Sequence, residues 1–222
     1  MQIYFGFIPT DALNKQIDTN IQIMGSDADG DYNLYRDEVT KQISHELLDN
    51  LLTKMLDLIA DKARRTKMQK LTNAIHTAID TLLKHILINL PNEKVVDTYF
   101  FMKDKCLFID NDGNRRVGFQ LSSQDAEAVK LGLQHATNSA DPHPHLQTVM
   151  DILIRANLEH FVVDFSKHLH LGMIKRKAIP IAEAAVNKAS QAAIHKLLPS
   201  MDNEACLRLT NHFAQFVVIK DE

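Results

Sequence analysis

Apolar residues recur every three or four positions along most of the chain, which is the spacing of one face of an α-helix. Residues 31–90 contain neither glycine nor proline, and they carry one apolar stripe over 39–59 and a second over 68–86. A basic segment, residues 61–67, separates the stripes. One continuous helix would be roughly 80 Å long at 1.5 Å per residue. The pattern therefore predicts two antiparallel helices joined near this segment.

After Pro91 the pattern changes and predicts a small sheet. Three short runs rich in apolar and β-branched residues follow one another at 98–102, 106–109 and 117–121. The pair Asp112-Gly113 is typical of a hairpin turn, because such turns need positive φ angles. Residues 2–7 also alternate as a short strand does. We expect the three runs to form an antiparallel β-meander.

The remainder of the chain is predicted to be helical. We expect Ser122 or Ser123 to cap a helix, Gly172 to end the helix over 146–171, and Pro180 to open the next one. The polar, proline-containing segment 137–145 is the best candidate for a linker. The fold class is thus mainly α (α+β), with helical hairpins packed on a small three-stranded antiparallel meander. We expect a single domain over 1–222, with a potential internal boundary near 137–145 that separates 1–136 from 146–222.

Composition narrows the class of protein without naming an activity. Hydrophobic residues make up 45% and charged residues 24%, as in ordinary globular chains, and the net charge of −3 provides no global attraction for nucleic acid. No apolar run is long enough to span a bilayer, and residues 1–8 lack the basic start of a signal peptide. Cys106 and Cys206 are expected to be buried thiols. A cytoplasmic location follows as the expectation.

The segment Asp27–Glu38 resembles the calcium-binding loop of EF-hand proteins. Five oxygen donors match the ligand positions of that twelve-residue loop, namely Asp27 at the first position, Asp29 at the third, Asp31 at the fifth, the carbonyl of Asn33 at the seventh and Glu38 at the twelfth. If the resemblance holds, these residues bind calcium as a cofactor.

Two features favour a solvated turn over a calcium site. Tyr32 stands where an EF-hand loop has glycine. Asp110–Asn114 nearly repeats the acidic pattern between predicted strands, where no helix-loop-helix is expected. The calcium hypothesis also needs a helix over 10–24, but Ile21 and Ile23 alternate there as strand residues do.

Histidine and basic residues supply two further hypotheses. Six of the eleven histidines lie between residues 135 and 170. Among them, His160 and His168 share one helical face with Asp164, a set of side chains that could bind a transition metal. Basic side chains would form one phosphate-binding surface if the fold gathered them, and these are Lys62, Arg64, Arg65, Lys67, Lys70, Arg115, Arg116, Lys175, Arg176 and Lys177. Surface charges at helix ends are the simpler interpretation.

We expect a non-enzymatic cytoplasmic binding or regulatory module that acts through a protein partner or through self-association. No phosphate-binding loop, zinc motif or activated nucleophile is present in the sequence. The leucine-rich helices over 36–90 and an alanine face formed by Ile181, Ala185, Ala189 and Ala192 are the candidate interfaces. Calcium binding at 27–38 is the first alternative function, and a histidine-bound metal is the second. Nucleic acid and a membrane span are not expected.

Overall fold

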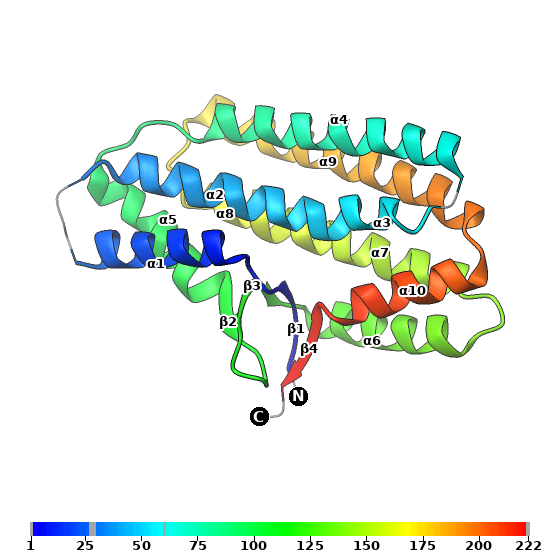
Figure 1. Cartoon of the computed structure of the whole chain (residues 1–222). Helices are drawn as coiled ribbons and strands as arrows, with labels where there is room; N and C mark the ends of the chain where they lie inside the picture. Colours follow the sequence, from blue (N-terminus) through cyan, green and yellow to red (C-terminus); the bar gives the residue numbers. More distant parts are fainter. Residues whose placement is uncertain (1, 27–29, 60, 221–222) are drawn as a thin grey trace.

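The computed structural model describes residues 2–26, 30–59 and 61–220, and it shows long helices packed beside a small sheet (Figure 1). The α-helices are α1 (Asp11–Gly25), α2 (Tyr32–Leu48), α3 (Lys54–Leu56), α4 (Lys62–Ile86), α5 (Asn92–Lys105), α6 (Ser123–Asn138), α7 (His143–Leu158), α8 (Phe165–Lys167), α9 (Met173–Leu197) and α10 (Asn203–Ala214). Two π-helical segments, η1 (Asp49–Thr53) and η2 (Glu159–Asp164), continue α2 and α7, and a 3₁₀ turn, η3 (Leu198–Ser200), follows α9. The predicted mainly helical α+β class is confirmed.

The sheet is antiparallel and joins the two ends of the chain. Its strands are β1 (Gln2–Phe7), β2 (Leu107–Ile109), β3 (Arg115–Gln120) and β4 (Val217–Lys220), in the order β2-β3-β1-β4. Phe5 on β1 lies opposite Phe119 on one side and Val217 on the other. Gly118 is required at the centre, because a Cβ there would lie 2.0 Å from the carbonyl oxygen of Phe5.

The predicted meander was wrong in one of its strands. Residues 98–102 belong to α5, and β1 and β4 complete a sheet of four strands instead. The aromatic and β-branched residues in this run favoured a strand, but Val95, Thr98, Tyr99 and Met102 are buried at helical spacing. Tertiary burial of this helical face outweighs the local β-propensity.

Residues 11–25 form a helix, which resolves the ambiguity over 10–24. Thr10 caps α1 by accepting a hydrogen bond from the amide of Leu13. At the same end of α1, the Thr10 amide donates to Glu46 near the end of α2 at 2.9 Å. Nearer the other end of α1, Asn20 Nδ2 donates to the carbonyl of Tyr35 near the start of α2 at 2.9 Å. These contacts make α1 and α2 an antiparallel hairpin.

The predicted pair of helices over 36–90 is confirmed as α2 and α4. Val39, Ile43, Leu47, Leu51 and Met55 of the first apolar stripe are buried. In Figure 1, α4 and α9 lie side by side as an outer layer over α2 and α7. Lys175, near the start of α9, donates to the carbonyl of His85 near the end of α4, so these two helices run antiparallel.

The start of α9 differs from the expected one. Gly172 is the N-cap of α9 and has a negative φ, and Pro180 lies inside that helix. The left-handed residue that ends the preceding turn is His170, with φ of 49°. A hydrogen bond between His170 Nε2 and Asp97 Oδ2, at 2.6 Å, connects His170 to α5. The sequence favoured glycine for this role because glycine adopts positive φ without steric cost.

One cluster of buried side chains extends from Ile3 to Phe216 and includes residues on both sides of the 137–145 segment. Ser122 caps α6 as predicted, and α6 packs against α7 beyond the short connection between them. Within the described residues, no helix combines the length and the apolar character needed to cross a bilayer.

Candidate functional site

The acidic segment 27–38 connects α1 to α2. Asp27 and Asp29 lie outside the described residues. Asp31 is the N-cap of α2, where its Oδ1 accepts a hydrogen bond from the amide of Asn33 at 3.0 Å. Because α2 begins at Tyr32, Glu38 lies in the second turn of that helix, with its side chain exposed. Calcium binding by this segment stays a prediction.

The side chain of Asn33 has a role that the sequence did not suggest, since the EF-hand resemblance assigned a role only to the backbone carbonyl of this residue. Its side chain makes two hydrogen bonds with Leu90: Nδ2 donates to the carbonyl at 2.8 Å, and Oδ1 accepts from the amide at 2.9 Å. Asn92 makes a second connection, since its Nδ2 donates to the carbonyl of Gly30 at 2.8 Å. The start of α2 is thereby clamped to the segment between α4 and α5.

His160 and His168 both pack against Phe101. The ring centroids lie 5.1 Å and 4.9 Å from that of Phe101, and His160 also stacks on Phe119 at 4.5 Å. Burial lowers the pKa of His160 to about 4, so the ring is neutral at physiological pH. Asp164 forms an ion pair with Lys167 at 2.5 Å. Across the parts of the chain that the structure describes, no three His, Cys, Asp or Glu side chains are grouped so that they could hold a metal ion.

Both cysteines are free and buried, as the sequence predicted. Burial raises the pKa of the Cys106 thiol far above its usual range and that of Cys206 to about 11. Both groups are therefore thiols at neutral pH. The Sγ of Cys106 lies 3.4 Å from Nε2 of His160. Since the thiolate is the reactive form, the raised pKa values do not favour either cysteine as a nucleophile.

The fold separates the basic clusters. Arg115 and Arg116 lie on β3, where they pair with Asp18 and Asp110 at 2.7 Å each. Because α4 and α9 run antiparallel, the basic residues 62–70 and 175–177 lie at opposite ends of the outer layer. The clusters therefore do not form one compact phosphate-binding site.

The outer layer nevertheless has a charge opposite to that of the rest of the chain. The helices α4 and α9 together contain eleven of the 25 Lys and Arg residues but only two of the 28 Asp and Glu residues. Their formal charge is +9, and the chain total of −3 leaves −12 for all other residues. The exposed basic side chains of this layer, which we call the basic layer, are Lys62, Arg65, Lys67, Lys70, Lys84, Lys175, Arg176, Lys177, Lys188 and Lys196.

Apolar side chains protrude from the basic layer at the beginning of α9. Met173, Ile174 and Ile181 are 75%, 87% and 73% exposed, respectively. We call these three residues the apolar edge. On the same helix Ile179, Val186 and Ile194 are buried, so the apolar edge is not needed for the packing of α9.

Of the two interfaces that the sequence suggested, one is buried and the other is exposed. The leucine-rich stripe of α2 is part of the core, whereas Ala185 and Ala192 of the alanine face are exposed on α9, beyond the apolar edge along the chain. The spacing of Ile174, Ile181 and the alanines gave a signal for a second apolar face on α9, but it could not show which face packs inward. No protein-family model, curated protein or solved structure matches this chain.

Proposed function

We propose that the chain is a non-enzymatic cytoplasmic binding module that docks an acidic protein partner on the basic layer, centred on the apolar edge. The observation that carries the proposal is the exposure of Met173, Ile174 and Ile181 on a folded helix. Adjacent exposed apolar side chains are typical of interaction surfaces. Two free thiols suit a reducing cytoplasm.

Charge favours an acidic partner over a second copy of the chain. In a two-fold symmetric dimer the same surface patch faces itself. Pairing through α9 would bring Lys175, Arg176 and Lys177 near the basic side chains of another basic layer, and Glu183 is the only acidic residue of α9. A partner that presents carboxylates around an apolar centre avoids this repulsion and gains faster association.

The test compares the same type of substitution, an exposed apolar residue replaced by aspartate, on two different surfaces. Ile174→Asp places a charge in the apolar edge, and Leu34→Asp places one at a 53% exposed position on α2. A photo-crosslinker at residue 177 identifies the bound protein, whose purified form is then titrated against each variant. We expect Ile174→Asp to weaken binding at least tenfold and Leu34→Asp to leave it unchanged. Equal affinity for both variants contradicts the proposal.

Two controls distinguish other occupants of the surface. Light scattering across a concentration series should show a monomer; a dimer that Ile174→Asp dissociates would indicate self-association instead. Sedimentation with vesicles containing anionic lipids should leave the protein in the supernatant. Binding to vesicles that Ile174→Asp abolishes would identify a lipid surface as the ligand and overturn the choice of a protein partner.

Calcium binding at 27–38 is the second candidate. It is favoured by the helix α1, which ends at Gly25 just before this segment, although α2 begins within the segment at Tyr32. Calcium bound only by the folded state raises the melting temperature. We expect millimolar calcium to raise the Tm and Glu38→Gln to abolish the increase, while Glu127→Gln on α6 serves as the matched control. An unchanged Tm in calcium eliminates this candidate.

A further inference from the structure

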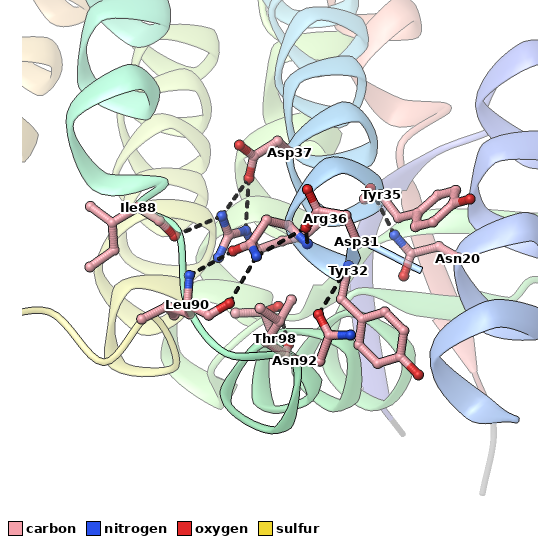
Figure 2. Close-up of polar contacts among 12 residues, drawn as sticks. Asn20, Asp31, Tyr32, Tyr35, Arg36, Asp37, Ile88, Leu90, Asn92 and Thr98 are labelled. Carbon is pink, nitrogen blue, oxygen red and sulfur yellow. Dashed lines mark hydrogen bonds and ion pairs between the residues drawn. The ribbon is translucent and has the colours of Figure 1, made fainter. Parts of the chain in front are cut away.

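Arg36 is the most deeply buried charged side chain among the described residues, with 2% of its surface exposed. Its Nε donates to Asp37 at 2.8 Å and its Nη2 to the carbonyl of Ile88 at 3.0 Å (Figure 2). Its Nη1 has no hydrogen-bond acceptor within the described part of the chain. A buried donor without an acceptor is costly, so an acceptor atom that reached Nη1 would remove this cost.

Arg36 lines a cavity of about 40 Å³ between α1, α2 and α5. Asn20, Thr98 and Ser44 contribute polar groups to its wall, while Val39, Met102 and Phe165 are among the apolar ones. No carboxylate lines this cavity. The volume exceeds the 10–15 Å³ that one water needs. Arg36 is the one cationic residue that lines this cavity, and most of the other lining residues are apolar.

A second, larger cavity lies farther along α2. It has a volume of about 70 Å³ and is lined mainly by leucine and isoleucine side chains from α2, η1, α4 and α7, with Val186 and Ser190 from α9. Ser44 and Phe161 line both cavities, so the two are neighbours across these side chains. Arg36 and Ser44 are separated by eight residues, which is about 12 Å along a helix axis.

The helices are irregular where they line the second cavity. Leu51 and Leu52 belong to η1, and Phe161 and Val162 belong to η2. Segments of π-helix are rare and occur frequently at functional sites, because they redirect side chains that a regular helix would pack elsewhere. Two such segments facing one cavity form an independent reason to consider it a ligand site.

We infer that these cavities together bind a medium-chain carboxylic acid. The carboxylate accepts hydrogen bonds from Arg36 Nη1, and the alkyl chain extends along α2 past Ser44 into the second cavity. A charge-assisted hydrogen bond satisfies the unpaired donor, and each buried methylene adds about 0.8 kcal/mol of transfer free energy. The site lies inside the helical layers, away from the apolar edge, and the inference does not depend on the proposed docking function.

The first test uses decanoate and 1-decanol as probes in isothermal titration calorimetry. We expect decanoate to bind at least tenfold more tightly than the alcohol, which has the same chain but no carboxylate. We expect Arg36→Met to remove this preference. Equal binding of both probes, or a preference that persists in Arg36→Met, overturns the assignment of Arg36 to the carboxylate.

A second variant keeps the inference testable if Arg36→Met does not fold. Ser44→Leu fills the junction between the cavities and leaves Arg36 unchanged. Its matched control is Ser166→Leu on α8, since both serines are half-buried and donate to a carbonyl three or four residues earlier in the chain. Ser44→Leu should weaken decanoate binding at least tenfold and Ser166→Leu should not. Equal weakening by both contradicts the internal site.

Salt separates the internal site from nonspecific attraction to the basic layer. Exposed charges are screened at high ionic strength, and buried ones are screened much less. We expect decanoate affinity to change less than threefold between 50 mM and 500 mM sodium chloride. A tenfold loss would place the decanoate on the surface and overturn the inference.

Discussion

Arg36 and Arg116 are both largely buried arginines, but they use their donors differently. Arg116 pairs with Asp110 through Nε at 2.7 Å, and its Nη1 donates to the carbonyls of Gly6 and Gln215. Arg36 pairs with Asp37, bonds Ile88 and is one of the residues that line a cavity, and its Nη1 has no acceptor in the described chain. Burial alone therefore does not distinguish a structural arginine from one that can bind a ligand.

The two arginines therefore connect different parts of the fold. Arg116 joins the end of β1, the turn before β3 and the segment after α10, so it connects the two ends of the chain. Arg36 anchors the segment between α4 and α5 and keeps one nitrogen for another partner. A buried arginine whose donors meet protein acceptors stabilises the fold, whereas one that faces a cavity with a free donor is a candidate for recognition.

Replacing Arg116 should have the largest effect. Arg116→Met leaves Asp110, which is 3% exposed, without its cationic partner and removes two bonds to carbonyls. Breaking a buried ion pair is strongly destabilising. We expect the Tm to fall by roughly 10 °C in differential scanning calorimetry. Arg115→Met, at a 31% exposed side chain on the same strand, is the matched control and should change the Tm by about 2 °C. Similar effects at both positions would remove the structural distinction assigned to Arg116.

Low pH should weaken the ion pair between Arg116 and Asp110, with a smaller loss of stability than Arg116→Met causes. The Arg116 guanidinium lowers the pKa of Asp110 to about 2, and the hydrogen bonds from its own turn contribute to the shift. A carboxylate whose pKa is lower in the folded state stabilises the fold above its unfolded pKa, near 4, and this stability is lost as the pH falls toward 2. The denaturant midpoint should decrease over this range. In Asp110→Asn the decrease should be shallower, and an identical slope would show that the pair does not contribute.

Much of the architecture around these arginines follows from sequence pattern. The apolar stripes predicted α2 and α4, and the Asp112-Gly113 turn predicted the hairpin in which Gly113 has φ of 84°. The pattern failed at 98–102, where a helical face was hidden among aromatic and β-branched residues. It also could not pair β1 with β4, because contacts between the two chain ends leave no local periodicity.

The site was harder to predict than the fold. Arg36 lies three residues before Val39 and seven before Ile43, so it continues the apolar stripe of α2. This position was a signal for burial, but a charged residue at the end of a stripe is usually exposed. The cavities could not be predicted, since they depend on how four helices meet and on two π-helical segments. In contrast, the alanine face of α9 could be recognised in the sequence, but the sequence did not show whether this face packs inward or is exposed.

Replacing Arg36 should cost less stability than replacing Arg116. Arg36→Met removes bonds to Asp37 and Ile88, but Asp37 is 25% exposed and can be solvated, and the unpaired Nη1 is lost as well. Hydrogen bonds to charged groups contribute about 1.5–3 kcal/mol. We expect a decrease in Tm of roughly 5 °C. Arg155→Met, on an exposed ion pair with Asp125, is the control and should have little effect. A decrease as large as that of Arg116→Met would indicate that Arg36 is primarily structural.

Asn157 lines the second cavity and also has an unpaired buried atom, and replacing it should have the smallest effect on stability. It is 4% exposed, its Nδ2 donates to the carbonyl of Leu153 at 2.7 Å, and its Oδ1 has no donor among the described residues. Asn157→Leu removes this unpaired acceptor, so we expect a gain of about 1 kcal/mol, or roughly 3 °C in Tm. Asn20→Leu should instead lower the Tm, because Asn20 bonds the carbonyl of Tyr35.

The two asparagine variants also test how unpaired atoms should be interpreted. The alkyl chain of decanoate gains nothing from the Oδ1 of Asn157, so Asn157→Leu should retain or tighten its binding. Arg36→Met, at the carboxylate end, should lose it. If Asn157→Leu destabilises the protein as much as Asn20→Leu does, Oδ1 has a partner in solution, and an unpaired buried atom no longer distinguishes Arg36 from Arg116.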